Sequence, residues 1–300
     1  MSRWSTRCPP CWTWSADDRD NRRVYRLERH GLSSFVHWFD LPAGAGATTL
    51  ALLVLAALAA GWVDAVAGGG GLIQLPALLL GLGPASPAVL ALGTNKLAGI
   101  CGTLTSALTY NNRVRPDLRT ALPMAALALA GALVGAGIAS ALPSSAIPPI
   151  VLVALVLVLA YTVARPQLGR LTAPRHTGKR HHLTAGGLGF SVGVYDGAVG
   201  PGTGSFLLFG LVSLLGYGFL QASAKAKIAN VATNLGALLV FVPQGAVFWK
   251  LGLLMGAANV CGGYVGARTA VARGAGFVRV LFVAVSATLV LRLGYQVIRR

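Results

Sequence analysis

The stretch DAVAGGGGLIQLP, residues 64–76, interrupts a long apolar segment with four consecutive glycines. The segment runs from residue 48 to residue 82, and as one straight helix it would reach about 50 Å, against a hydrocarbon core of about 30 Å. It must therefore tilt, re-enter a bilayer or break into two pieces. Glycine adopts backbone angles that other residues avoid, so the four glycines mark the expected break.

Composition predicts a membrane protein. Of the 300 residues 55% are hydrophobic and only 11% are charged, whereas a soluble domain carries about 25% charged residues. A net charge of +17 would suggest nucleic-acid binding in a soluble protein. Here the basic residues lie mostly between apolar runs, where they set orientation. We therefore expect a multi-pass protein of the cell (inner) membrane, in contact with the lipid bilayer and with no nucleic-acid partner.

A second copy of the glycine motif lies later in the chain. GWVDAVAGGGG (61–71) aligns with GVYDGAVGPGT (193–203), so that Asp64 falls on Asp196, 132 positions later. Further blocks align at nearly the same spacing, which indicates an internal duplication.

The next aligned block carries a lysine in each copy. LGTNKLAGICGT (92–103) aligns with SAKAKIANVATN (223–234), and Lys96 falls on Lys227, 131 positions later. A charge at the centre of a bilayer costs roughly 3 kcal/mol or more, so each lysine is expected to face a partner or a cavity.

The repeat organises the expected fold, an all-α polytopic membrane protein of about eight transmembrane helices in two four-helix repeats with glycine-broken first helices. Its expected parts are a basic, disordered leader (1–46), a first repeat (47–165), a basic linker (166–182) and a second repeat (183–298). The expected crossings are 48–82, 86–110, 118–141, 146–164, 183–215, 221–243, 249–268 and 277–298.

Loop charge predicts the orientation. With the N-terminus in the cytoplasm, the basic loop 111–119 and the basic linker lie inside, as the positive-inside rule requires. The loop 268–279, with three arginines, is then the one exception, placed outside. An even number of crossings makes the two repeats parallel, which is the arrangement we favour; if the glycine segments form hairpins that add a crossing, the repeats are inverted instead.

The two glycine breaks are typical of an anion site. A helix that resumes after a break directs N–H groups and the positive end of its dipole at the gap. The predicted substrate-binding residues combine this backbone with lysines and polar side chains: Gly68, Gly69, Gly70, Gly71, Thr94, Asn95, Lys96, Gly200, Gly202, Thr203, Gly204, Lys227, Asn230 and Asn234. Asp64 and Asp196 are the predicted proton-coupling residues. The structural alternative is that the aspartates only pair with the lysines or cap the freed backbone.

Other kinds of site lack their sequence signals. A nucleotide loop needs a Lys-Ser/Thr pair after the glycines, which neither motif has. Cys8 and Cys11 form a CPPC motif without the βαβ pattern of a redox protein. The repeats contain no histidine or clustered carboxylates for acid–base catalysis. We therefore expect no enzyme, no cofactor and no metal site. We assign the glycine pairs Gly131/Gly135 and Gly262/Gly266, each separated by three residues, to close helix packing.

These motifs resemble the sulfite exporter TauE/SafE family, also described as toluene-sulfonate uptake permeases. The resemblance extends over about residues 47–298 and is carried by AGWVDAVAGGGGLIQLPALL (60–79), ALGTNKLAGICGT (91–103), YDGAVGPGTGSFL (195–207) and ASAKAKIANVATN (222–234). It implies a membrane transporter of duplicated four-helix units. The substrates that it implies are sulfite, sulfoacetate or related organosulfonates.

The sequence therefore predicts a secondary transporter, a permease or exporter, of a small anion such as sulfite or an organosulfonate. The chain has no ATP-binding motif, so an ion gradient or the gradient of the solute would drive transport. Two alternatives stay open: a channel-like or cation-conducting protein with the aspartates along its path, and an accessory membrane subunit. A homo-oligomer is also left open.

Overall fold

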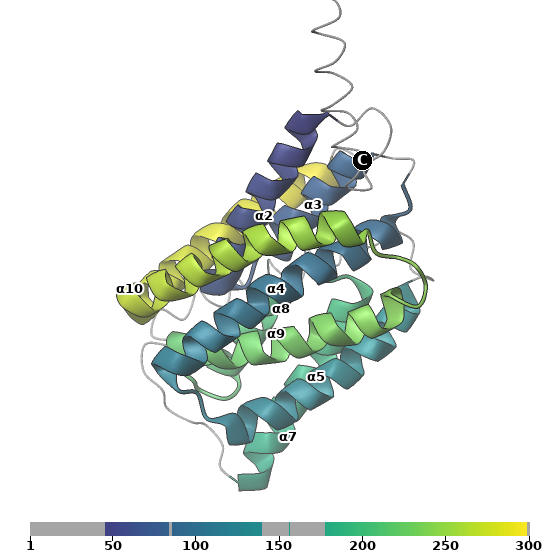
Figure 1. Ribbon diagram of the computed structural model, residues 1–300. Helices are drawn as coiled ribbons and strands as arrows, with labels where there is room; N and C mark the ends of the chain where they lie inside the picture. The colour runs from purple at the N-terminus through teal and green to yellow at the C-terminus, as the bar shows by residue number, and fades with distance from the viewer. Residues whose placement is uncertain (1–45, 84–85, 140–155, 157–177, 299–300) are drawn as a thin grey trace, which may run out of the picture.

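The computed structural model describes residues 46–83, 86–139, 156 and 178–298, and every regular element in these ranges is a helix (Figure 1). The prediction of an all-α protein is thus confirmed for the described residues. The helices are α2 (Ala47–Ala67), α3 (Gly71–Leu82), α4 (Ala88–Val114), α5 (Leu118–Ala139), α7 (Gly178–Ala198), α8 (Thr203–Ser213), α9 (Phe219–Phe241) and α10 (Trp249–Ile298). Three predicted parts lie wholly or almost wholly outside the described residues: leader residues 1–45, the crossing expected at 146–164 except for residue 156, and linker residues 166–177.

The first glycine motif turns the chain back on itself. Gly68 ends α2 in the left-handed conformation, with a φ of 79°, and its N–H donates to the carbonyl of Asp64. A Cβ added at Gly70 would lie 2.5 Å from the carbonyl oxygen of Ala60, and one at Gly81 would lie 3.0 Å from Leu53. Later residues of α3 thus contact earlier residues of α2. The two helices therefore run antiparallel and form a helical hairpin.

The second motif forms the equivalent hairpin from α7 and α8. Gly200 and Gly202 both have a positive φ, 89° and 86°, in the turn between the helices. The chain then returns to the start of α7, where the hydroxyl of Tyr217 lies 2.9 Å from Nε2 of His181. Each glycine break is therefore the tip of a hairpin, and neither broken segment crosses the molecule as one helix.

The remaining packing gives every helix a direction. Helices α2, α4 and the first part of α10 run parallel, because residue numbers rise in the same direction along each pair of contacting helices. Helix α2 meets α10 through Leu58 with Gly262 and Trp62 with Gly266, and α4 meets α10 through Leu97 with Gly252 and Gly102 with Gly263. Helices α5, α7 and α9 also run parallel to one another, through Met124 with Gly189, Ala132 with Gly197, Asp117 with Lys225 and Leu129 with Gly236. The two sets are antiparallel, through Val114 with Gln221 and Thr103 with Asn234.

These directions correct the favoured arrangement of the repeats. By the sequence alignment α2 corresponds to α7, α4 to α9 and α5 to the first part of α10, and in each pair the helices run in opposite directions. Helices at aligned positions thus run in opposite directions, which supports the inverted arrangement that the sequence left open over the parallel arrangement that it favoured. The physical reason is that each hairpin returns the chain to the end of the bundle where it began. The number of times that each repeat crosses the molecule then changes from even to odd, and the second repeat runs in the opposite direction.

The repeats interlock through glycine. Helix α5 of the first repeat packs on α7, and α10 of the second repeat packs on α2. A Cβ at Gly131 or Gly135 would lie 2.2 Å or 2.0 Å from a backbone carbonyl oxygen of α7, and Gly262 and Gly266 meet α2 in the same way. Only glycine allows this approach of two backbones, so the predicted packing role of these residues is confirmed.

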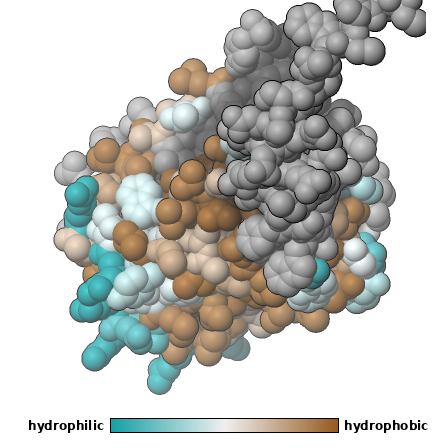
Figure 2. Space-filling view, turned by 45° about the horizontal axis from the view of Figure 1, so that its top comes forward, coloured by the Kyte–Doolittle hydropathy of each residue, from teal (hydrophilic) through white to brown (hydrophobic). Residues whose placement is uncertain are grey.

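The outer surface is apolar, and the charge gathers at one end. Two described helices, α2 and α5, are long and apolar enough to cross a membrane, and large aliphatic side chains such as Leu52, Leu80 and Leu122 are more than half exposed. Figure 2 shows a largely hydrophobic face with hydrophilic side chains along its lower left edge.

Most of the exposed basic residues near the described helix ends lie at one end of the bundle, whereas Lys250, at the start of α10, lies at the other. The end where α4 finishes carries seven of them: Arg113, Arg115, Arg119, Lys179, Arg180, Arg268 and Arg273. The kink in α10 at Gly274, with a φ of 72°, lies at this end, since the first part of α10 runs parallel to α4. The arginines at 268 and 273, part of the exception to the expected topology, thus lie on the same side as the other basic loops. The start of α2 lies at the opposite end.

Candidate functional site

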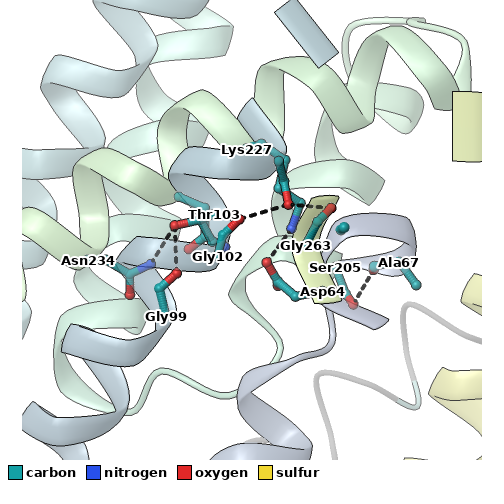
Figure 3. A network of polar contacts seen from close by, with 12 residues as sticks. Asp64, Ala67, Gly99, Gly102, Thr103, Ser205, Lys227, Asn234 and Gly263 are labelled. Carbon is teal, nitrogen blue, oxygen red and sulfur yellow. Dashed lines mark hydrogen bonds and ion pairs between the residues drawn. The ribbon is translucent and has the colours of Figure 1, made fainter. Parts of the chain in front are cut away.

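The two hairpin tips meet inside the bundle. A Cβ added at Gly68 would lie 2.2 Å from the carbonyl carbon of Gly204, so the two backbones are in direct contact. The N–H of Ser205 donates to the carbonyl of Gly68 at 3.1 Å, and its hydroxyl donates to Ala67 at 2.9 Å (Figure 3). The two aligned glycine motifs thus meet at one centre.

Two ion pairs cross between the repeats at this centre. Nζ of Lys96, on α4, lies 2.6 Å from Oδ1 of Asp196, on α7. Nζ of Lys227, on α9, lies 2.7 Å from Oδ2 of Asp64, on α2 (Figure 3). Each aspartate therefore pairs with the lysine of the other repeat. The sequence predicted pairing as the structural alternative, but the inverted packing decides which partners meet.

The two carboxylates differ in their surroundings. The side chain of Asp196 is 2% exposed, and its Oδ1 accepts hydrogen bonds from both Lys96 and the hydroxyl of Thr203. Its Oδ2 is buried and has no hydrogen-bond partner among the described residues. Asp64 is 13% exposed. Asp196 is thus the more deeply buried of the two carboxylates.

A polar cavity of about 40 Å³ lies at the hairpin tips. Its charged lining residues are Asp64, Asp196 and Lys96. Its other lining residues are the amides and hydroxyls of Gln74, Asn95, Asn230, Asn234, Asn259, Thr103 and Thr203 and the backbones of Gly68, Gly70, Gly71, Gly99, Gly200, Gly202 and Gly204. The space has the size of one or two water molecules.

Most of the predicted residues come together here, and three do not line the cavity. Gly69 is in the tip of its hairpin but outside the lining, and Lys227 lies behind Asp64. The hydroxyl of Thr94 accepts a hydrogen bond from the N–H of Phe248 at 3.0 Å, so it joins α4 to the loop before α10. The remaining predicted residues, including both aspartates, line the cavity.

Sequence reasoning missed Gln74 and Asn259. The amide of Asn259 donates to Oε1 of Gln74, and Nε2 of Gln74 lies 3.4 Å from the carbonyl oxygen of Asn95. Glycines on both neighbouring helices, Gly61 and Gly102, make room for Asn259. Each amide is a lone polar residue inside an apolar helix, a signal that could have identified both.

Thr103 and Asn234 mark the symmetry of the site. They occupy aligned positions in the two repeats, and the structure places Nδ2 of Asn234 3.5 Å from the hydroxyl of Thr103 (Figure 3). Thr103 in turn donates to the carbonyl of Gly99 at 2.9 Å. Aligned residues that meet each other lie near the axis that relates the repeats, and this axis passes beside the cavity.

The arrangement offers donors for an anion and charges that balance. Helices α3 and α8 both begin at the cavity, so their first-turn N–H groups and positive dipole ends are directed towards it. The amide groups can donate as well. The two lysines are matched by the two aspartates, so additional positive charge becomes available when a carboxylate is protonated or moves away.

Comparison with known proteins gives consistent matches over the helical region. Residues 53–293 match the family described as Sulfite exporter TauE/SafE. A Sinorhizobium sp protein named "Probable membrane transporter protein ORF9" is 41% identical over 244 residues, which cover 81% of this chain and 92% of the relative. "Probable membrane transporter protein YfcA" of Escherichia coli strain K12 is 33% identical over 249 residues, 82% of this chain and 90% of the relative. No solved structure matches.

Proposed function

Because this chain belongs to the sulfite exporter TauE/SafE family and is a membrane transporter, we propose that its solute is a small anion, sulfite or an organosulfonate. The observation that carries the proposal is the meeting of the two hairpin tips, with a lysine–aspartate pair on each side. Paired helix breaks near the midplane are where transporters with internal repeats hold their solutes. The solute would occupy the cavity between the tips.

Neutral hydrogen-bond donors would make most of the contacts to the anion, and the lysines, which are paired with aspartates, would contribute charge. The N–H groups of Gly71, Thr203 and Gly204 would donate to its oxygens, because those of Leu72, Ile73 and Ser205 already donate to backbone carbonyls. The amides of Asn95, Asn230 and Asn234 would add further hydrogen bonds. Sulfite and sulfonate groups carry three oxygens, which suits several donors arranged around one small space. The cavity of about 40 Å³ has the size of one or two water molecules, so we expect the tips to separate when the anion binds.

Proton coupling follows from the balance of charge. Protonation of Asp64 or Asp196 leaves its lysine without a counter-charge, and an anion then restores neutrality. Asp64 is the better candidate for the exchanging proton because its side chain is 13% exposed, against 2% for Asp196. Lys96 and Thr203 also hold one oxygen of Asp196. Anion and proton would therefore move together.

The membrane orientation follows from the basic end. Cytoplasmic loops carry an excess of Lys and Arg, so the end with Arg113, Arg119 and Arg268 faces the cytoplasm. In this orientation residue 46, at the start of α2, would lie on the outer side, whereas the sequence predicted a cytoplasmic N-terminus. Labelling of single cysteines introduced at residue 47 and at residue 179 with an impermeant reagent in intact cells would test the orientation.

A substrate panel tests the proposed function. Proteoliposomes that contain the full chain are offered sulfite, sulfate, thiosulfate, sulfoacetate, taurine and acetate, with protein-free liposomes as the control. We expect saturable accumulation of sulfite or sulfoacetate and none of acetate. Uptake limited to acetate, or transport of none of the anions, would contradict the proposal.

One observation favours a second candidate function. The buried Oδ2 of Asp196 has no partner among the described residues, and carboxylate oxygens together with amide oxygens can bind a small cation. In a cation-conducting protein, replacement of Lys96 or Lys227 by Gln would leave the flux in place. In the anion transporter the same change removes the anion flux.

A further inference from the structure

A second candidate site lies on the outer surface, away from the hairpin tips. It is a groove of about 520 Å³ between α4 and α10 at the basic end of the bundle, lined by Thr105, Leu108, Thr109, Asn112, Arg113, Tyr264 and Arg268. None of these residues lines the central cavity. The proposed transport function does not use this groove.

The two walls of the groove carry the charge in a defined arrangement. On α10 the guanidinium of Arg268 donates to the hydroxyl of Tyr264 at 2.8 Å and lies 5.2 Å from the centre of its ring. On α4 Arg113 occupies the last turn of the helix. Both arginines are exposed. A guanidinium held at one edge by tyrosine keeps its other N–H groups for an anionic oxygen.

The threonine hydroxyls in the groove do not compete for the anion as donors. Thr105 donates to the carbonyl of Cys101 at 2.9 Å, and Thr109 donates to Thr105 at 2.8 Å. The available donors are therefore the two arginines, the amide of Asn112 and the hydroxyl of Tyr264, which accepts from Arg268 and keeps its own proton to donate. This set is selective for a group with a negative charge and several oxygens, such as a phosphate.

The surface next to the groove is aliphatic. Leu108 is 56% exposed, and Leu104, one turn further from the basic end, is 47% exposed. Val265, on the facing helix, is 53% exposed. A chain that enters a membrane places such side chains against lipid tails, with the basic rim at the level of the headgroups. The groove thus joins a phosphate-binding rim to an acyl-chain surface.

We propose that this groove binds an anionic phospholipid, with its phosphate between Arg113 and Arg268 and its acyl chains along the exposed leucines of α4. Basic pockets between helices on the cytoplasmic side are suited to anionic headgroups. Free inorganic phosphate offers the same oxygens but leaves the aliphatic surface uncovered. The lipid satisfies both parts of the groove.

Lipid binding to the purified full chain tests the proposal. Native mass spectrometry in detergent measures the affinity for the first bound phosphatidylglycerol, with phosphatidylcholine as the zwitterionic reference. Each basic residue near a membrane surface contributes about 1 kcal/mol to anionic lipid binding. Loss of two contacts in Arg113→Gln/Arg268→Gln should therefore weaken phosphatidylglycerol binding by about tenfold or more. Binding of phosphatidylcholine, whose choline offsets the charge of its phosphate, should weaken much less.

A matched variant separates the groove from general surface charge. Arg119→Gln/Arg180→Gln removes the same charge from exposed positions at the same end, and it should retain the affinity for phosphatidylglycerol. Equal losses in the two double variants, or no loss in either, would overturn the proposal. Displacement of the lipid by millimolar inorganic phosphate would overturn it as well, because the groove would then be a site for a soluble anion.

Discussion

The two ion pairs at the hairpin tips are equivalent by repeat but differ in their exposure. Lys96 and Asp196 are both 2% exposed, and Thr203 adds a hydrogen bond to the carboxylate. Asp64, the partner of Lys227, is 13% exposed. A more deeply buried pair resists separation because its charges are poorly hydrated, whereas a more exposed pair can exchange a proton or an ion. We infer that the first pair holds the repeats together and that the second is the working pair.

The largest expected effect is the loss of stability when either lysine of the two ion pairs is replaced. Lys96→Gln leaves a buried carboxylate without a counter-charge, and breaking such a pair should lower the free energy of unfolding by about 3–5 kcal/mol. Lys227→Gln should cost less, about 2 kcal/mol, because water can reach Asp64. Thermal unfolding of both variants in the same detergent measures the order.

A double variant shows whether the charge causes this loss. Lys96→Gln/Asp196→Asn removes both charges, so it should recover much of the stability that Lys96→Gln loses. If the double variant is less stable than Lys96→Gln alone, the buried carboxylate is not the cause.

The next largest loss of stability is expected at the contact between Gly68 and Gly204, because this contact positions both lysine–aspartate pairs. Gly68→Ala forces a side chain into a left-handed conformation and against Gly204, at a cost of about 2–4 kcal/mol. The control is Gly187→Ala, an exposed glycine of α7 with open space around it, which should stabilise the helix by about 0.5–1 kcal/mol. A Gly68→Ala protein as stable as the wild type would mean that the tips do not stay in contact.

Proton coupling should separate the two aspartates. Asp64→Asn should reduce accumulation driven by an imposed pH gradient by about tenfold, equivalent to about 1.4 kcal/mol, while downhill exchange of the anion continues. Asp196→Asn should affect stability more than coupling. The measurement is uptake into proteoliposomes with and without the gradient. If gradient-driven uptake persists in the double Asn variant, both carboxylates are structural.

The smallest effect is expected at the basic end, outside the two pairs. Burial alone would raise the pKa of Asp117, but the hydrogen bond from Thr120 and the charge of Lys225 together hold this pKa below its ordinary value. A lowered pKa contributes stability above the unfolded value, near pH 4, that is lost as the pH falls through the folded value. Because Asp117 is about half exposed, the loss should be below about 1 kcal/mol.

Comparison with Asp117→Asn over the acid range isolates this contribution. The wild-type protein should lose slightly more stability on acidification than Asp117→Asn does. Parallel curves for the two proteins would show that Asp117 makes no pH-dependent contribution to the fold.

The sequence predicted the helices and the polar residues of the site but not the direction of the repeats. Apolar length and the glycine motifs placed the helix breaks near Gly68 and Gly200, where the structure has them. Whether a broken segment continues or turns back depends on tertiary packing, such as α3 against Leu53, which local sequence does not encode. The count of crossings, and with it the relation of the repeats, therefore needed the structure.

The same limit applies to the partners within the site. Asp64, Asp196 and the two lysines were identifiable as scarce charges in apolar sequence, but the crosswise pairing follows from the inverted packing. Thr94 was predicted to contact the solute, yet its hydroxyl binds the backbone of Phe248. Gln74 and Asn259 interact across 185 positions, a distance at which sequence patterns carry no pairing information.

The central claim is that the lysines of the crossed pairs supply the charge that carries an anion. The most direct test measures sulfite uptake into proteoliposomes by the wild type, Lys227→Gln and Lys96→Gln/Lys227→Gln, with folded protein selected by size-exclusion chromatography and Lys179→Gln as an exposed control. We expect wild-type uptake in the control and a loss of about thirtyfold or more in the double variant. Sustained sulfite uptake by the folded double variant would contradict the account.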